Sequence, residues 1–191
     1  CNLMDSDRIQ ICGEESFGTG SNHIREKDGI WAVLFWLNII AIKNESVSNI
    51  LLSHWKKFGR HYYSRHDYEN IDPDLADKTI SELMGNFKGL TEKNIDGLSI
   101  LNCNEFNYTD PVDLEQSNHQ GIRIILKNSR IVLRISGTGT EGATLRIYFE
   151  KYEPYDIDRE TQAILLPLIQ LADKLTNLRA RSGKPEPNLI T

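Results

Sequence analysis

The apolar run at residues 30–42 constrains the fold of this chain more than any other segment. It contains two tryptophans and a phenylalanine, and Asn38 is its only polar residue. The run is shorter than the roughly 18–20 residues that a helix needs to cross a bilayer, so it predicts a core helix. A helix that is apolar on nearly every side must be covered on more than one face. We therefore expect residues upstream of position 1 to belong to the same domain.

A domain boundary is predicted near Gly59. Residues 46–55 have the pattern of a second helix that ends at this glycine, and residues 60–67 look extended. Pro73 stands at a favourable first-turn position for a helix that runs to about residue 84. We interpret residues 1–59 as the tail of one domain and residues 60–191 as a self-sufficient α+β domain.

The second of these domains is rich in strand patterns. A closing helix is expected over residues 159–181, and Pro167 should kink this helix or mark its true start. A hairpin is predicted around the turn Asn128-Ser129. The three strand-like segments are residues 122–127, 130–136 and 144–150.

The densest polar chemistry lies in the loop of residues 13–21, just before the apolar run. Glu14, Glu15 and Ser16 stand between glycines, and Lys27 follows within a short cationic segment. Carboxylates and hydroxyls suit a polyhydroxylated ligand, because each sugar hydroxyl both donates and accepts a hydrogen bond. The structural interpretation is that a glutamate caps a helix and Ser16 satisfies a turn. Taken alone, the four residues Gly-Glu-Glu-Ser favour that structural role.

A second polar loop lies between two predicted strands at residues 134–146. Its glycines would let backbone N–H groups converge on an anion. Arg134 and Arg146 stand on the entering and leaving strands, where paired strands would aim both guanidinium groups at the loop. Arginine binds phosphate bidentately, although the Lys-Ser/Thr of a Walker loop is absent. Phosphate binding and a glycine-rich turn with solvated arginines both stay open from the residues alone.

The overall charge and the cysteines narrow the class of protein. A net charge of -5 argues against a nucleic-acid partner, whose phosphates demand a basic surface. Three cysteines without paired spacing predict reduced thiols and a cytoplasmic location. The histidines lack the spacing of metal ligands, so we expect no metal site in this chain.

Short motifs in the two polar loops resemble those of a known family. GEESFGTGS and HIREKDG resemble the sugar-binding segment of the phosphoglucomutase family, within the α-D-phosphohexomutase superfamily, and RISGTG with GATLRIY resembles its phosphate-binding loop. The resemblance extends over essentially the whole chain. It implies an α/β remnant of the third domain, followed by a fourth, α+β domain with an antiparallel sheet and packing helices, similar to the TATA-box-binding protein.

The resemblance also implies roles for individual residues. Glu14 and Ser16 match residues that grip sugar hydroxyls, Lys27 matches a proposed general acid/base, and His23 and Arg25 border the sugar site. The phosphate-binding positions that it implies are Arg134, Ser136, Gly137, Thr138, Gly139 and Arg146.

Members of the family interconvert glucose 1-phosphate and glucose 6-phosphate through a phosphoserine and glucose 1,6-bisphosphate, with Mg²⁺ at the transferring phosphoryl group. The family's words T-A-S-H-N-P and D-G-D-G-D-R, which supply the serine and the metal loop, do not occur here. We therefore expect a C-terminal fragment that is inactive alone and binds no cofactor itself. Its expected partners are a phosphorylated hexose and the upstream domains of the same enzyme, with no membrane span.

Two other functions remain open. One is a non-catalytic phosphoglucomutase-like protein used for binding or scaffolding. The other is an unrelated phosphosugar-binding module without a catalytic parent. The upstream sequence of the parent protein would distinguish these two functions from the fragment of an active enzyme, because it would show whether the phosphoserine and metal-loop motifs are present.

Overall fold

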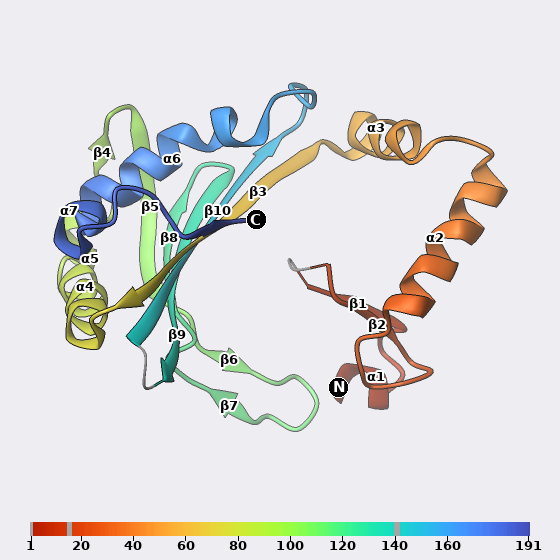
Figure 1. Ribbon diagram of the computed structural model, residues 1–191, viewed down its shortest axis with the longest axis horizontal. Helices are drawn as coiled ribbons and strands as arrows, with labels where there is room; N and C mark the ends of the chain where they lie inside the picture. Colours follow the sequence, from red (N-terminus) through yellow and green to blue (C-terminus); the bar gives the residue numbers. More distant parts are fainter. Residues whose placement is uncertain (1, 15–16, 140–141) are drawn as a thin grey trace. The chain divides into compact units, whose positions relative to one another are not determined.

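The computed structural model describes residues 2–14, 17–139 and 142–191 and divides the chain into two compact units (Figure 1). The first unit consists of Cys1–Lys57 and Tyr108–Ser117, and the second of Phe58–Asn107 and Asn118–Thr191. The first unit is therefore discontinuous in sequence. Its second segment falls within residues 60–191, which the sequence interpretation assigned to a single domain.

Short elements and two longer helices make up the first unit. β1 and β2 pair antiparallel, as do β6 and β7. The elements are α1 (Asn2–Asp5), β1 (Ile11–Gly13), β2 (Thr19–Ser21), α2 (Gly29–Lys43), α3 (Val47–Phe58), β6 (Tyr108–Thr109) and β7 (Gln116–Ser117).

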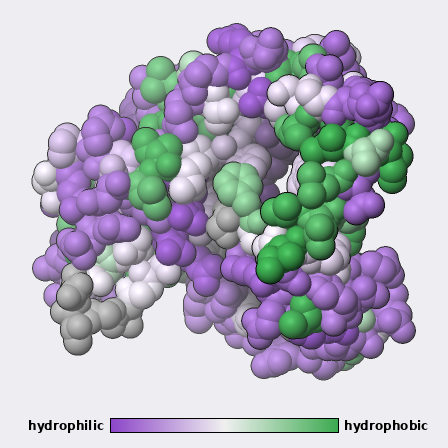
Figure 2. Space-filling model, turned by 45° about the vertical axis from the view of Figure 1, so that its right-hand side comes forward, coloured by the Kyte–Doolittle hydropathy of each residue, from purple (hydrophilic) through white to green (hydrophobic). Residues whose placement is uncertain are grey.

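The helix α2 forms where the apolar run predicted it. Asp28 begins the helix by accepting a 2.9 Å hydrogen bond from the backbone N–H of Trp31, and the left-handed Asn44 ends it. None of its residues is buried, and Ile30 is 77% and Ile42 82% exposed. Figure 2 shows the apolar surface that results as a green band. The described residues thus leave α2 without the cover that its composition demands.

No single helix among the described residues is long and apolar enough to cross a membrane. The pair α2 and α3 reaches that length and composition only when both are counted together, across a bend of 79°.

The second unit is built on one antiparallel seven-stranded sheet with the order β11-β3-β10-β9-β8-β5-β4. Buried residues alternate along its central strands, as expected for a sheet covered on one face. The strands are β3 (Arg60–Ile71), β4 (Asn94–Ile95), β5 (Leu98–Glu105), β8 (Ile122–Leu126), β9 (Ser129–Gly139), β10 (Gly142–Glu153) and β11 (Leu189–Ile190).

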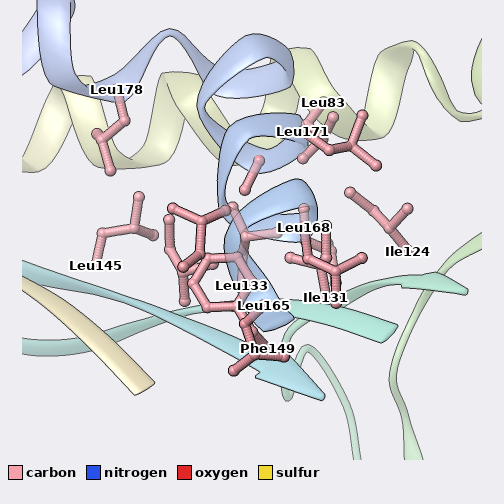
Figure 3. Close-up of a cluster of buried hydrophobic side chains, with 14 of the residues drawn as sticks. Leu83, Ile124, Ile131, Leu133, Leu145, Phe149, Leu165, Leu168, Leu171 and Leu178 are labelled. Atoms are coloured by element: carbon pink, nitrogen blue, oxygen red, sulfur yellow. The ribbon is translucent and has the colours of Figure 1, made fainter. Parts of the chain in front are cut away.

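Helices pack on this sheet, namely α4 (Pro73–Gly85), α5 (Phe87–Leu90) and α6 (Thr161–Thr176), and α7 (Leu178–Ser182) packs against α4. Figure 3 shows leucines of α6 facing side chains of the sheet. Leu165 and Leu168 of α6, and Leu145 and Phe149 of β10, are each at most 2% exposed. Burying a side chain of this size contributes about 1.5–3 kcal/mol, so this layer is the main source of the unit's stability.

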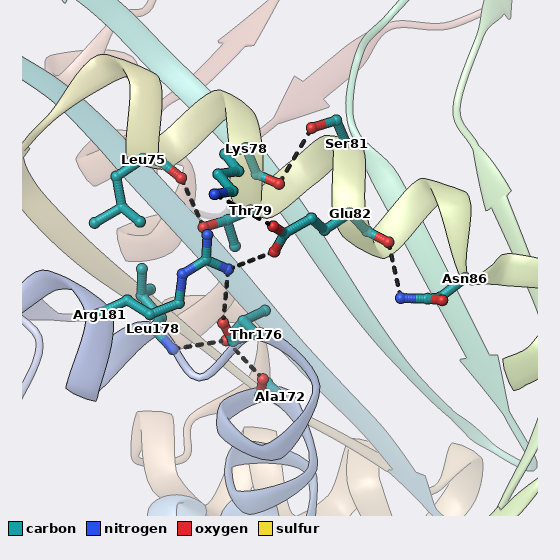
Figure 4. Close-up of polar contacts among 10 residues, drawn as sticks. All are labelled: Leu75, Lys78, Thr79, Ser81, Glu82, Asn86, Ala172, Thr176, Leu178 and Arg181. Atoms are coloured by element: carbon teal, nitrogen blue, oxygen red, sulfur yellow. Dashed lines mark hydrogen bonds and ion pairs between the residues drawn. The ribbon is translucent and has the colours of Figure 1, made fainter.

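Polar contacts add to the packing between α4 and α7 (Figure 4). Nη1 of Arg181 lies 2.8 Å from Oε2 of Glu82 on α4. Thr176 donates its hydroxyl to the carbonyl of Ala172 at 2.8 Å, inside the last turn of α6. Exposed ion pairs contribute at most about 1 kcal/mol, so these contacts orient the helices more than they stabilise them.

The predicted fold class is confirmed, and two local predictions are wrong. The β8–β9 turn is Lys127-Asn128 instead of Asn128-Ser129, because Leu126 pairs with Ser129 and Asn128 takes the left-handed conformation with φ of 56°. The closing helix is two helices, since the chain turns left-handed at Asn177. Pro167 does not start this helix, because Glu160 caps the N-terminus of α6 and the proline lies inside it.

Candidate functional site

The first polar loop connects β1 and β2 in the first unit. The backbone N–H of Glu14 donates to the carbonyl of Gly18 at 2.9 Å, and the N–H of Phe17 donates to the carbonyl of Glu14 at 3.0 Å. These two bonds tighten the loop and fix where the backbone of Glu14 lies. Ser16, the predicted partner of Glu14 in sugar binding, lies outside the described residues.

Lys27 and Glu14 form an ion pair. Nζ of Lys27 lies 2.6 Å from Oε2 of Glu14, and both side chains are about half exposed. The segment that carries Lys27 is also tied to β2, because the N–H of Asp28 donates to the carbonyl of Thr19 at 2.9 Å. The structure therefore brings together a proton donor and an acceptor at an accessible position.

His23 and Arg25, the other predicted sugar-binding residues, have protein partners. Nδ1 of His23 hydrogen bonds to the hydroxyl of Ser21, and Nε2 lies 3.0 Å from Oδ2 of Asp28. The Trp31 N–H and then His23 lower the pKa of the Asp28 carboxyl below its ordinary value. Arg25 Nε lies 2.8 Å from Oδ1 of Asp5, which joins this segment to α1. Within the described residues, both side chains therefore brace the loop.

A cavity of about 710 Å³ lies in the first unit. Glu14, Arg25 and Lys27 line it, whereas His23 does not. Two residues of the β6–β7 hairpin, Tyr108 and Asp110, also line it. The sequence reasoning assigned no role to these two, because the local sequence carries no signal that places this hairpin beside the loop of Glu14.

The second polar site lies on β3, β9 and β10. Arg134 on β9 and Arg146 on β10 are directly opposite each other in the sheet register, and Asp67 on β3 is opposite Arg146 on the other side. Oδ2 of Asp67 lies 3.5 Å from Nε of Arg146, and Oδ1 lies 2.9 Å from Nε of Arg65. The Asp67 side chain is only 3% exposed. Sequence reasoning missed both Arg65 and Asp67.

This arrangement gathers positive charge on one face of the sheet. Arg65 and Arg146 share the carboxylate of Asp67, and Arg134 lies opposite Arg146 and is exposed. Like charges that face each other on paired strands are destabilising. An anion bound at Arg134 would relieve this repulsion, and a phosphate matches the guanidinium fork.

The glycine-rich segment beside these arginines is more regular than predicted. β9 continues to Gly139 and β10 starts at Gly142, so Thr138 and Gly139 are paired strand and not open loop. Ser136 pairs with Thr144 and Thr138 with Ala143, which leaves Gly137 as the extra residue of a bulge with φ of 73°. Such a bulge favours glycine and redirects the strand. The side chain of Thr138 and residues 140–141 lie outside the described part.

Arg146 contacts the neighbouring strand β3. Its Nε lies 3.5 Å from Oδ2 of Asp67, which belongs to that strand. That both guanidinium groups point at the glycine hairpin stays a prediction.

The described residues contain no group of three or more His, Cys, Asp or Glu that could hold a metal ion. The Cys12 and Cys103 thiols are both free.

Comparison with known proteins gives one consistent family. Residues 60–188 match the family described as Phosphoglucomutase-1, C-terminal domain, and residues 1–58 match Phosphoglucomutase/phosphomannomutase, alpha/beta/alpha domain III. A phosphoglucomutase of Rhizobium radiobacter is 52% identical over 194 residues, and a cytoplasmic phosphoglucomutase of Bromus inermis is 46% identical over 209 residues. Each alignment covers 100% of this chain and 36% of the relative.

A solved structure gives the same result. The open form of the exocytosis-sensitive phosphoprotein pp63/parafusin, a phosphoglucomutase from Paramecium, is 46% identical with a TM-score of 0.88. It matches 100% of this chain and 34% of its own. The chain thus spans about a third of the length of the relatives that it matches, and an unrelated phosphosugar-binding module is excluded.

Proposed function

Because this chain belongs to the phosphoglucomutase family, we propose that it is the C-terminal part of an enzyme that interconverts glucose 1-phosphate and glucose 6-phosphate. In this proposal residues 1–59 end the sugar-binding third domain, and residues 60–191 form the phosphate-binding fourth domain. The parent enzyme acts through a phosphoserine and glucose 1,6-bisphosphate. Its location is cytoplasmic, which agrees with the names of the relatives from Bromus inermis and Solanum tuberosum.

The row of Asp67, Arg146 and Arg134 carries the proposal for phosphate binding. Arg134 is exposed and lies opposite another arginine, whose nearest carboxylate also serves Arg65. The role of this row is to hold the substrate phosphate that is not being transferred. Ser136 and the backbone of Gly137 to Gly139 lie on the same hairpin and would add hydrogen-bond donors.

Glu14 and Lys27 support the proposal for sugar recognition. The cavity that they line falls within the 300–1,000 Å³ range that is usual for small-ligand sites. In the bound state, Glu14 accepts hydrogen bonds from sugar hydroxyls. Nζ of Lys27 exchanges its contact with Glu14 for one with a reacting sugar oxygen, where it gives or takes a proton. In this proposal Ser16 grips sugar hydroxyls together with Glu14, and His23 and Arg25 border the site.

The phosphoryl donor and the Mg²⁺ of the family belong to the upstream part of the parent. The described residues of this chain offer no metal-binding group, so they do not fit the ion, and we assign it no step here. The chain by itself should therefore be inactive. Turnover of glucose 1-phosphate by the purified 191-residue chain, in a coupled assay free of contaminants, would contradict this.

The test of the phosphate assignment uses the parent enzyme with Arg134→Ala. Loss of a charge-assisted hydrogen bond costs about 1.5–3 kcal/mol, so phosphosugar affinity should fall roughly tenfold or more. Inorganic phosphate should also compete less well against the variant. Arg130→Ala is the matched control, because Arg130 lies on the same strand and pairs with Glu150.

Glu14→Ala separates the two parts of the site. It should weaken recognition of the sugar hydroxyls and leave competition by inorganic phosphate unchanged. Equal competition by inorganic phosphate against the wild type and Arg134→Ala would refute the phosphate assignment.

A further inference from the structure

We propose that Tyr108 and Asp110, on the β6–β7 hairpin, bind the sugar hydroxyls of the phosphorylated hexose together with Glu14 and Lys27. The inference rests on the proposed function and extends its sugar site to a segment that lies far away in sequence. It makes the hairpin a second wall of that site.

The hairpin belongs to the first unit although strands of the second unit flank it in sequence. The chain leaves the second unit after Asn107 and re-enters it at Asn118. Between these points, Nδ2 of Asn2 donates to Oδ2 of Asp113 at 2.7 Å. Nη1 of Arg8 also lies 3.4 Å from the carbonyl oxygen of Pro111. These contacts hold the hairpin against the N-terminal segment.

The Asp110 carboxylate is held in one orientation. Its Oδ1 accepts a hydrogen bond from the N–H of Val112 at 2.8 Å, and a longer one from Asp113 at 3.4 Å. Its own N–H donates to the carbonyl of Glu115 at 2.8 Å. The N–H of Val112 lowers the pKa of the Asp110 carboxyl below its ordinary value, so the group is a charged acceptor at neutral pH. A fixed acceptor loses little conformational entropy when a ligand binds.

Tyr108 supplies the complementary chemistry. Its hydroxyl lies 3.5 Å from Oδ2 of Asp110, and its side chain is 40% exposed. A phenol hydroxyl can donate and accept, as a sugar hydroxyl does, and its ring offers an apolar face to the C–H groups of a sugar. Because this contact is long, the hydroxyl is available to a ligand.

The cavity joins the two walls. Glu14 and Lys27 line it from the β1–β2 side, and Tyr108 and Asp110 line it from the hairpin. Because Glu14 is paired with Lys27 at 2.6 Å, Asp110 adds a carboxylate that carries no such lysine partner in the described residues. A hexose has hydroxyls around its whole ring, so acceptors on both walls fit it better than acceptors on one.

The experiment uses the full-length parent enzyme with Tyr108→Phe and Asp110→Asn. Phenylalanine keeps the ring, and asparagine keeps the oxygen that accepts from Val112. Each variant should raise KM for glucose 1-phosphate by about three- to tenfold, the effect of losing one hydrogen bond to a ligand. Inhibition by inorganic phosphate should not change, because the phosphate is bound elsewhere. Glu115→Gln and Tyr155→Phe are matched controls, since neither residue lines the cavity and Tyr155 is 92% exposed.

The other outcomes overturn the inference. An unchanged KM in both variants would mean that the hairpin does not touch sugar, and a lowered melting temperature with unchanged KM would assign it a docking role only. A parallel loss of inhibition by inorganic phosphate would place these residues at the phosphate. If Asp110→Asn does not fold, Tyr108→Phe alone decides, because it leaves the turn of Asp110 intact.

Failure of the proposed function has a different signature. In that case the wild-type parent would not convert glucose 1-phosphate, or Glu14→Ala would leave KM unchanged. Failure of the further inference alone leaves the wild type active and Glu14→Ala impaired.

Discussion

Asp67→Asn should lower the free energy of unfolding of the second unit by about 2–3 kcal/mol. The carboxylate of Asp67 is 3% exposed and lies 2.9 Å from Nε of Arg65 and 3.5 Å from Nε of Arg146. The substitution removes its charge and keeps its shape. It leaves Arg65 and Arg146 without the carboxylate that they share, and Arg134 lies opposite Arg146.

The magnitude follows from the burial of each partner. Removing one partner of a buried ion pair costs about 3–5 kcal/mol, because the other charge is left uncompensated. Asparagine still offers Arg65 a neutral acceptor, and the Arg146 side chain is 34% exposed, so water screens part of its charge. Both effects reduce the expected loss of unfolding free energy to about 2–3 kcal/mol.

Urea unfolding followed by circular dichroism would measure this cost. Asp96→Asn is the matched control in the same unit, because Asp96 pairs with Lys174 at 2.9 Å where both side chains are more than half exposed. That change should cost less than about 1 kcal/mol. Combining Asp67→Asn with Arg146→Met should recover part of the loss. Equal costs for Asp67→Asn and Asp96→Asn would refute the reasoning that burial gives this carboxylate its weight.

Three further predictions concern stability. Gly59→Ala should destabilise the second unit by roughly 2–4 kcal/mol in a thermal melt, because Gly59 has φ of +80° and a Cβ would lie 2.5 Å from the Tyr152 hydroxyl. Adding Tyr152→Ala should remove the steric part of this cost, and an unchanged melting temperature in Gly59→Ala would contradict the prediction. Burial lowers the pKa of His66 from 6.5, so between the lowered pKa and 6.5 the unfolded chain binds more protons than the folded chain, and the free energy of unfolding should rise with pH. His66→Gln should reduce this rise when the free energy of unfolding in urea is measured across that pH range, and an unchanged slope would contradict the prediction. Limited proteolysis should cut the first unit before the second, since no residue of α2 or α3 is buried, whereas equal protection throughout would show that these helices are covered by association.

The sequence predicted the longer helices and the strands β3, β8, β9 and β10, because their signals are local. Pro73 begins α4, with the side chain of Asp72 accepting from the backbone N–H groups that follow. The run at residues 30–42 forms α2 as its composition requires. The break at Asn177 was missed because the apolar stripe continues on both sides of it, and periodicity does not register one left-handed residue. The β8–β9 turn was displaced by one residue for a similar reason, since register depends on the partner strand.

The candidate site also has features that the sequence predicted and features that depend on tertiary contacts. Glycine, carboxylate and arginine content pointed to the two polar segments, and the family resemblance gave Glu14, Lys27 and Arg134 their proposed roles. The pairing of Arg146 with Asp67 could not be predicted, because it depends on which strands are neighbours in the sheet. The protein partners of His23 were also hidden, although all of them lie within a few residues, because their contact requires the turn between β2 and α2.

By itself, the sequence determined the longer helices and the central strands of the sheet, the family of the chain, and which side chains have chemistry suited to sugar or phosphate. These properties follow from composition and spacing over a few residues. Only the tertiary structure decided that Asp67 neutralises Arg146 and not Arg134, and that Tyr108 and Asp110 join the cavity of Glu14. These residues lie tens of positions apart in the sequence, and the packing of the folded chain, not any local preference, brings them together.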